Sequence, residues 1–158
     1  MISKGEEQRA HLIMKLRGQG IRSASVLSAI ESVPRDIFIE NALKNHAWEN
    51  VTLPIGEGQT ISQPYIVALM TTALNLSGKE IVLEIGTGSG YQASILSLLC
   101  RRVYTIERIK TLHEFSNKKF NELRLNNITT KFGNGSLGWP EVCPFDRIIL
   151  TCAINQIP

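Results

Sequence analysis

The segment that most constrains the fold reads EIVLEIGTGSGYQASILSLL and runs from residue 80 to residue 99. Its first six residues form a short apolar run, which predicts a buried strand. Three glycines at alternate positions then predict a tight turn, and the apolar residues beyond them predict a helix. This order is typical of an α/β protein, because a parallel strand needs a crossover connection, usually a helix, to reach its neighbour.

The same alternation continues along the chain. Further strands are predicted over residues 102–107, 128–132 and 145–151, and a helix over 109–124. We therefore predict an α/β fold with a doubly wound, mostly parallel sheet of the Rossmann-like type. The chain stops soon after the fourth predicted strand, and an apolar edge strand without a neighbour is a hazard. The C-terminal strands of such a fold are therefore expected to be missing, so that the sequence is cut short.

A long segment, residues 1–78, precedes the first strand of this sheet. It contains four predicted helices, over residues 6–17, between Ser23 and Pro34, over 35–45 and over 64–74. Residues 46–61 are predicted to be a loop with one short strand. The last helix has apolar residues at helical spacing, which predict its buried face: Ile66, Leu69, Met70, Ala73 and Leu74.

These helices are expected to form a layer over the ligand edge of the sheet. Residues 1–158 would then be one domain, which is an ordinary domain size. Within it we expect an N-terminal helical and substrate region, residues 1–78, and a cofactor-binding α/β core, residues 79–158.

Composition narrows the classes of function. The net charge is only +3, which does not indicate a nucleic-acid partner, and no run of about 18 apolar residues indicates a membrane span. The chain has three cysteines, an odd number, with none at metal-ligand spacing: Cys100, Cys143 and Cys152. Two of them, Cys100 and Cys152, are expected to lie in apolar surroundings. We interpret all three as free thiols, and we expect a cytoplasmic protein without a bound metal.

The glycine turn and two acidic residues near it indicate the kind of ligand. A dinucleotide site would need a third glycine at position 91, which is Tyr91, and no Gly-Lys-Ser/Thr follows to make a phosphate loop. Glu84 lies near the end of the first predicted strand and would repel a pyrophosphate but attract a cation. Glu107 ends the second strand, where a carboxylate can accept both hydroxyls of a ribose. S-adenosylmethionine has this charge pattern, since it carries a ribose, a sulfonium and an ammonium but no phosphate.

The segment LPIGEGQTISQPYIVALM, residues 53–70, adds a more specific signal. Together with VPRDIF, VLEIGTGSGYQASIL, VYTIERI, GWPE and PFDRIILT, it closely resembles the protein-L-isoaspartate O-methyltransferase family, from about residue 8 to the end. The resemblance implies transfer of the methyl group of S-adenosylmethionine to the free carboxyl of L-isoaspartyl residues in damaged proteins and peptides. It also implies a monomer once the fold is completed.

The resemblance also implies the site residues. Ser62 matches the active-site serine, with Thr60 in support, and a loop around them closes over the cofactor and the substrate. The implied cofactor-binding residues are Gln59, Ile61, Glu84, Gly86, Thr87, Gly88, Ser89, Gly90, Glu107, Arg108, Asn134 and Gly135. Asn134 departs from the aspartate that is usual in the family, but its carbonyl could still accept a hydrogen bond.

The chemistry fits this set of residues, because a carboxylate acceptor is already ionised near pH 7 and needs no strong general base. We therefore interpret Ser62 as a group that orients the acceptor and not as a nucleophile. The alternative for Ser62 is structural, since a serine there could cap the helix that begins at Pro64.

Two other functions stay open at this stage. One is a catalytically inactive binding module that keeps only the glycine loop. The other is a methyltransferase of the same fold that acts on RNA or on a small molecule. The mild net charge counts against RNA, and the segment after the fourth strand, TCAINQ, lacks the polar-proline-aromatic motif that holds a planar amino group.

Overall fold

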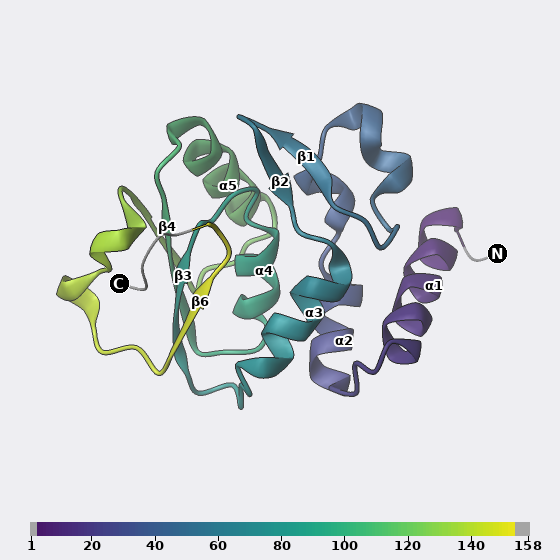
Figure 1. Ribbon diagram of the computed structural model, residues 1–158, viewed down its shortest axis with the longest axis horizontal. Coiled ribbons are helices and arrows are strands. Elements are labelled where there is room, and N and C mark those ends of the chain that lie inside the picture. The colour runs from purple at the N-terminus through teal and green to yellow at the C-terminus, as the bar shows by residue number, and fades with distance from the viewer. Residues whose placement is uncertain (1–2, 154–158) are drawn as a thin grey trace.

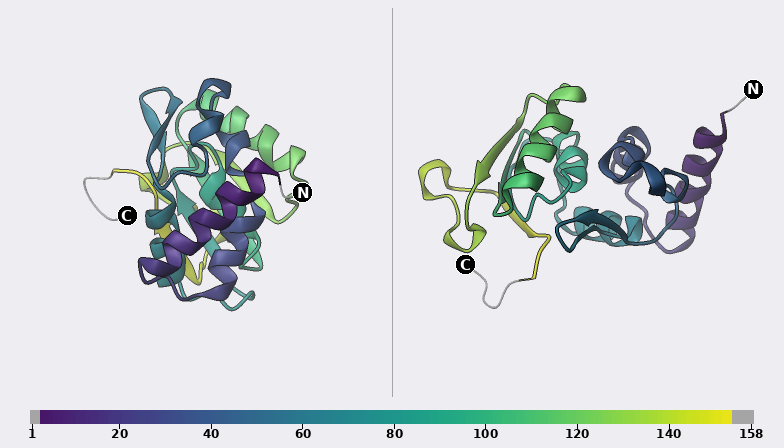
Figure 2. Two further views of the ribbon diagram at one scale, coloured as in Figure 1. Left: turned by 90° about the vertical axis from the view of Figure 1, so that its right-hand side faces the viewer. Right: turned by 90° about the horizontal axis from the view of Figure 1, so that it is seen from above.

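The computed structural model describes residues 3–153 of the chain. The N-terminal helices lie on one side of the molecule and a parallel sheet with its helices on the other (Figure 1). A small hairpin and helix α3 lie between these two parts. Figure 2 shows the same division from two further directions.

Four short elements form the N-terminal layer: α1 (Lys4–Gly18), α2 (Ala24–Ser32) and the 3₁₀ helices η1 (Arg35–Phe38) and η2 (Asn41–His46). The Ser3 hydroxyl accepts a hydrogen bond from the amide of Glu6, and Ser23 caps α2 in the same way through Val26. The single helix predicted over 35–45 is wrong, because two separate 3₁₀ turns occupy that stretch. The helices of the layer meet around a shared apolar core that includes Leu16, Ile30 and Phe38.

A hairpin follows the layer. Strand β1 (Leu53–Gly56) pairs antiparallel with β2 (Gln59–Ile61), so the predicted loop contains two short strands instead of one. Glu57 and Gly58 form its tip with left-handed φ values of 53° and 66°. Helix α3 (Pro64–Ala73) then begins with a proline in its first turn, where the missing amide costs nothing.

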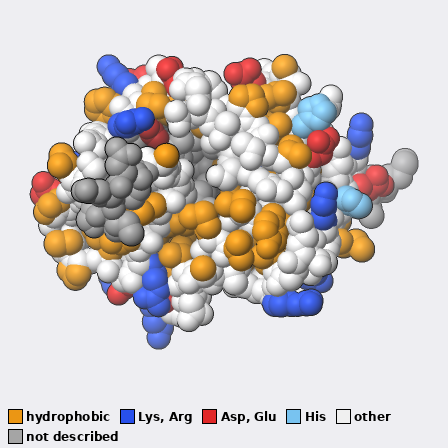
Figure 3. All heavy atoms as spheres, in the orientation of Figure 1, with side chains coloured by type: hydrophobic (Ala, Val, Ile, Leu, Met, Phe, Trp, Pro, Cys, Tyr) orange, Lys and Arg blue, Asp and Glu red, His pale blue; other side chains and the backbone are white. Residues whose placement is uncertain are grey.

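The predicted buried face of α3 is wrong for three of its residues. Ile66 and Leu69 are 38% and 45% exposed, and Ala73 is also exposed; hydrophobic side chains gather on the surface over this helix in Figure 3. The side that packs inward consists of Pro64, Val67, Ala68 and Thr71. Because α3 is apolar on nearly all sides, periodicity alone could not choose between its faces.

The central sheet has four parallel strands: β3 (Ile81–Ile85), β4 (Arg102–Glu107), β5 (Ile128–Phe132) and β6 (Arg147–Leu150). Their spatial order is β5-β4-β3-β6. Helix α4 (Tyr91–Ser97) connects β3 to β4, and α5 (Lys110–Glu122) connects β4 to β5. The predicted α/β class, the parallel sheet and the N-terminal helical layer are confirmed.

The two faces of the sheet are covered differently. Residues Val82, Val103 and Ile149 pack against α4 and α5, where Leu96 and Phe120 complete the cluster. On the other face, Leu83, Ile85 and Ile106 are covered by aromatic side chains of the β5–β6 connection. That connection contains the 3₁₀ turns η3 (Gly135–Leu137) and η4 (Pro140–Val142). Trp139 contacts Tyr104 edge-on at 5.3 Å between ring centroids, as a packing residue.

The strand order explains where a ligand would bind. The chain moves from β3 outward to β4 and β5 and then returns to place β6 on the opposite side of β3. The chain therefore reverses its direction across the sheet at β3, with β4 on one side and β6 on the other. Doubly wound proteins bind ligands in the crevice at the carboxyl end of the strands where this reversal occurs.

Candidate active site

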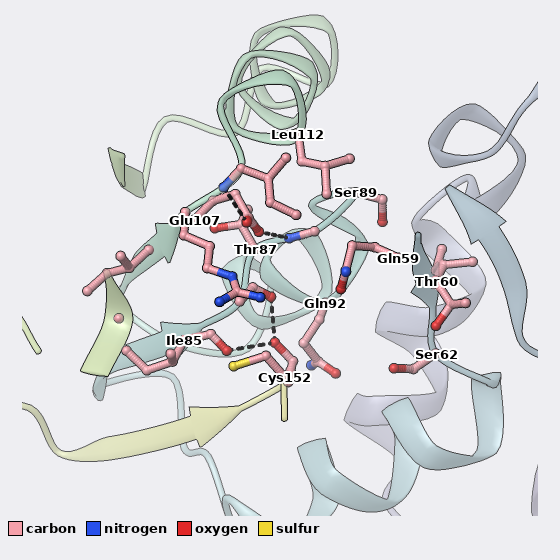
Figure 4. A pocket seen from close by; sticks show the side chains of 18 of the residues that line it. Gln59, Thr60, Ser62, Ile85, Thr87, Ser89, Gln92, Glu107, Leu112 and Cys152 are labelled. Carbon is pink, nitrogen blue, oxygen red and sulfur yellow. Dashed lines mark hydrogen bonds between the residues drawn. The ribbon is translucent and has the colours of Figure 1, made fainter. Parts of the chain in front are cut away.

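A cavity of about 880 Å³ lies at the carboxyl end of β3, between the sheet and the start of α3 (Figure 4). One wall comes from the loops after β3, β4, β5 and β6, and the other wall from the hairpin segment 59–62. The lining residues are Gln59, Thr60, Ile61, Ser62, Val67, Ile85, Gly86, Thr87, Gly88, Ser89, Tyr91, Gln92, Ile106, Glu107, Arg108, Ile109, Leu112, Asn134, Gly135, Ser136, Thr151, Cys152 and Ala153.

The structure brings most of the predicted site residues to this one cavity. Every residue named above as catalytic or cofactor-binding lines it, except Glu84 and Gly90. Segments far apart in the sequence therefore meet, since the hairpin, the glycine turn and the β5–β6 connection all contribute.

The glycines of the turn have two different tasks. Gly86, Gly88 and Gly90 all have left-handed φ values, of 96°, 55° and 92°. A Cβ atom on Gly90 would lie 2.8 Å from the Phe120 ring, so this position needs glycine for packing. A Cβ atom on Gly88 would meet only the tip of Ile55, at 3.5 Å, so Gly88 is the glycine that leaves its backbone open toward the cavity.

Glu107 is the acid that reaches the cavity. Its side chain is only 5% exposed, and both carboxylate oxygens accept backbone hydrogen bonds: Oε2 from the amide of Gly88 at 2.7 Å and Oε1 from the amide of Ile109 at 2.9 Å. The carboxylate thus ties the glycine turn to the end of β4. Each oxygen keeps a second lone pair, which a hydroxyl donor in the cavity could use.

Glu84 lies beneath the turn instead of facing the cavity. It is fully buried, and its Oε2 accepts a hydrogen bond from the Thr105 hydroxyl at 2.6 Å. The Thr105 hydroxyl is in turn 2.6 Å from the Thr87 hydroxyl. Burial raises the pKa of Glu84 to about 8, with a further contribution from the charge of Glu107 and an opposing one from the Thr105 hydrogen bond. Burial therefore favours the neutral form of Glu84, and this residue is not part of the cavity lining.

On the opposite wall, Thr60 and Ser62 lie next to each other across the cavity from Glu107 (Figure 4). The capping alternative for Ser62 is wrong, because the residue before α3 is Gln63 and no side chain caps the helix. The Ser62 hydroxyl is consequently not used by the start of the helix.

Several lining residues were missed by the sequence analysis. Gln92 donates from Nε2 to the Thr71 hydroxyl at 2.8 Å, which fixes its amide against α3. Thr151 donates to the carbonyls of Ile85 and Gly86, at 3.0 Å and 2.5 Å. Cys152 is exposed and lines the cavity, so the expectation that it sits in apolar surroundings is wrong. The signal for Thr151 and Cys152 was available, since both directly follow the fourth strand.

Asn134 lines the cavity, but its carbonyl is already engaged. Its Oδ1 accepts hydrogen bonds from the amide and the hydroxyl of Ser136, at 3.0 Å and 2.9 Å. These bonds form the turn that opens η3, so the side chain shapes the loop as well as facing the cavity.

Within residues 3–153, no three side chains of His, Cys, Asp or Glu converge as metal ligands would. In the same part of the chain, no helix has the length and apolar character that crossing a bilayer requires. The described residues of the cavity therefore offer hydroxyls, one carboxylate, amides, the thiol of Cys152 and the guanidinium of Arg108.

Comparison with known proteins gives a consistent result. Residues 7–158 match the sequence profile of protein-L-isoaspartate(D-aspartate) O-methyltransferase. The protein-L-isoaspartate O-methyltransferase of Parvibaculum lavamentivorans is 54% identical over 157 residues, which cover 99% of this chain and 71% of the relative. The protein of the same name from Dictyoglomus thermophilum is 54% identical over 153 residues, which cover 97% of this chain and 70% of that relative.

A solved structure of a protein-L-isoaspartate O-methyltransferase superposes with a TM-score of 0.88 at 28% identity, and the match covers 95% of this chain and 50% of that one. A Plasmodium falciparum structure, described as a putative protein-L-isoaspartate O-methyltransferase in complex with S-adenosyl-L-homocysteine, has the same fold, with a TM-score of 0.79 at 23% identity over 94% of this chain and 75% of that one. By sequence and by fold, the chain belongs to the protein-L-isoaspartate O-methyltransferase family.

Proposed function

We propose that this chain transfers the methyl group of S-adenosylmethionine to the free carboxyl of L-isoaspartyl residues in damaged proteins and peptides. One observation carries the proposal: in a member of this family, a single cavity joins the glycine turn and Glu107 to the Thr60–Ser62 segment. The first wall suits a nucleoside, and the second offers hydroxyls to a carboxylate.

The residues present fit the cofactor. The cavity is within the range of about 300–1,000 Å³ that is usual for small-molecule sites. Glu107 can accept the two ribose hydroxyls on its remaining lone pairs, and the open backbone at Gly88 allows close approach. When bound, the cofactor supplies an activated methyl group, whose bond to sulfur breaks as the bond to the acceptor oxygen forms.

The remaining assignments are part of the same proposal. Glu84 and Gly90 would act from outside the lining, by supporting the turn from below. Other residues of the lining would hold the cofactor: Gln59, Ile61, Gly86, Thr87, Ser89, Arg108, Asn134 and Gly135.

We assign the substrate region to residues 1–78 and the cofactor-binding core to residues 79–158. The three free thiols favour a reducing cytoplasm as the place of action. The protein would act as a monomer on isoaspartyl proteins.

The wall formed by residues 59–62 is here called the acceptor wall. On it, the Ser62 hydroxyl would donate a hydrogen bond to one oxygen of the substrate carboxylate, and Thr60 would support it. Because the acceptor is already an anion near pH 7, the protein has to align it and exclude water but does not have to remove a proton.

The test is methyl transfer from labelled S-adenosylmethionine to a short peptide that contains L-isoaspartate, with the same peptide containing aspartate as the control. We expect base-labile label on the isoaspartyl peptide alone. Tight binding of S-adenosylhomocysteine without any transfer would instead identify a binding module, and transfer to RNA alone would identify a different acceptor.

The role of Ser62 is tested by Ser62→Ala. A lost hydrogen bond to a charged group costs about 1.5–3 kcal/mol, so turnover should fall about 10- to 100-fold while the affinity for S-adenosylhomocysteine stays the same. Ser32→Ala, an exposed serine at the end of α2 that is not part of the cavity lining, serves as the matched control. Unchanged turnover would remove Ser62 from the mechanism, and a loss of about 10⁴-fold or more would indicate a nucleophile.

A further inference from the structure

We infer that Arg35 is a positioning residue for the acceptor wall, which holds the backbone of Ser62 from behind and places an unpaired positive charge there that favours an anionic acceptor. This inference rests on the proposed function for its substrate, although part of its test does not depend on activity.

Arg35 belongs to the N-terminal layer but reaches the hairpin segment. Its side chain is completely buried. The guanidinium donates from Nη1 to the carbonyl of Ser62 at 2.9 Å and from Nη2 to the carbonyl of Val51 at 3.1 Å. The guanidinium therefore joins the segment before the hairpin to the segment after it. The bond to the second of these segments is to Ser62, the residue proposed to contact the acceptor.

The charge of Arg35 has no acidic partner. In the part of the chain that the structure describes, none of the ion pairs includes this residue. Its guanidinium instead lies 5.1 Å from the ring centroid of Tyr91, the first residue of α4 and a member of the cavity lining. Burial lowers the pKa of Arg35, but an arginine remains charged at any physiological pH. A buried cation without a counter-ion is unusual, because burying a charge is costly unless it is paired.

The location of this charge suggests what balances it. The Ser62 carbonyl receives the guanidinium hydrogen bond, and the Ser62 hydroxyl lies on the same residue at the cavity. In a low-dielectric interior the field of an unpaired charge is weakly screened, so it extends to the place where the acceptor would bind. A substrate carboxylate beside Ser62 would then meet a favourable potential without touching Arg35.

A neutral side chain holds the same segment. The side-chain Oδ1 of Asn50 accepts a hydrogen bond from the backbone amide of Tyr65 at 2.9 Å. The backbone carbonyl of Asn50 accepts one from the Gln63 side chain at 3.0 Å. Its own amide group donates to Gln19 in the helical layer. The start of α3 is thus fixed by one charged and one neutral residue, so the geometric and electrostatic contributions can be separated by mutation.

The experiment compares four variants of the full chain. Arg35→Gln removes the charge, Arg35→Lys keeps it, and Asn50→Ala removes only the neutral contact. Arg9→Gln is the matched control, since Arg9 belongs to the same layer and lies 4.5 Å from the centroid of the Trp48 ring. For each variant we would measure kcat and KM for the isoaspartyl peptide, the Kd for S-adenosylhomocysteine, and hydrogen exchange over residues 59–65.

We expect Arg35→Gln to lower kcat/KM for the peptide at least 30-fold, with the Kd for S-adenosylhomocysteine within threefold of the unmodified chain. Arg35→Lys should recover at least fivefold of that loss, Asn50→Ala should lose less than tenfold, and Arg9→Gln should stay within twofold. Exchange over 59–65 should accelerate in Arg35→Gln and in Asn50→Ala but not in Arg9→Gln.

Equal losses of peptide turnover and of S-adenosylhomocysteine binding in Arg35→Gln would overturn the inference, and so would the same loss in Arg9→Gln. If the unmodified chain transfers no methyl group, the proposed function fails by itself. The exchange experiment would still decide whether Arg35 positions the segment.

Discussion

The two walls of the cavity are built on different kinds of support. The wall with the glycine turn grows out of the parallel sheet, and its bonds join the ends of neighbouring strands, as between Glu107 and Gly88. The wall with Ser62 continues from a two-stranded hairpin, which is marginally stable alone. It is held by Arg35 of the N-terminal layer and by Asn50, which follows that layer. The comparison teaches that the cofactor wall is a property of the sheet, whereas the acceptor wall depends on a layer distant from it in sequence.

The strongest way to test the independence of the sheet wall is Gly90→Ala. The substitution forces a left-handed residue with φ of 92° and places Cβ 2.8 Å from Phe120, so we expect a loss of about 2–4 kcal/mol in unfolding free energy. The hairpin control is Gly58→Ala, where φ is 66° but no atom lies within 4 Å, with an expected loss of about 1 kcal/mol. Urea unfolding measures both, and equal losses would show that packing at the turn does not matter.

The next largest effect is expected for Glu107→Gln. A glutamine has a single acceptor oxygen, so the amide of either Gly88 or Ile109 loses its partner, at a cost of about 1–3 kcal/mol. We expect the Kd for S-adenosylhomocysteine to rise at least 30-fold in calorimetry. Glu141→Gln, which changes an exposed acid paired with Lys131, should change this Kd less than twofold. A Kd that does not respond would place the ribose contacts elsewhere.

Much of the sheet wall could be predicted from the sequence, because its residues follow strands whose carboxyl ends share one edge. The acceptor wall could not be derived from periodicity, since the Arg35 contact joins segments without any shared pattern. The same limit explains the error at Ile66 and Leu69, where a helix apolar on all sides gave no basis for choosing a face. The raised pKa of Glu84 was also out of reach, because it depends on burial and not on residue type.

A different kind of test uses the pH dependence of stability and concerns Glu84. The pKa of folded Glu84, about 8, lies above its ordinary value of 4.5, so the folded chain keeps a proton that the unfolded chain releases. The contribution of Glu84 to stability is therefore lost as pH rises from about 4.5 to about 8, at up to about 1.4 kcal/mol per pH unit.

Glu84→Gln removes this titration but keeps an acceptor for Thr105. The stability of the variant relative to the unmodified chain should consequently increase from pH 5 to pH 8 in urea unfolding. A difference that is constant over this range would mean that Glu84 is ionised in the folded protein.

The smallest effect concerns the contact between the two walls. The Thr111 hydroxyl of α5 donates to Glu57 at the hairpin tip, at 2.8 Å, on an exposed surface. Thr111→Val should cost at most about 1 kcal/mol and should speed dissociation of S-adenosylhomocysteine about two- to threefold in stopped flow. Thr129→Val, which removes a comparable exposed contact with Arg102, should leave the rate unchanged. Equal rates for both variants would show that the tip does not restrain the ligand.

Thr151 has a consequence for how the protein is made. The Thr151 hydroxyl donates hydrogen bonds to the carbonyls of Ile85 and Gly86, and 65 residues separate Thr151 from Gly86. Strand β6, which directly precedes Thr151, pairs with β3 although it is the last of the four sheet strands in chain order. The chain emerges from the ribosome with its N-terminus first, so the glycine turn emerges well before Thr151, which bonds to it. A nascent chain that stalls before residue 151 would therefore carry an unfinished ligand site, however complete its first three sheet strands are.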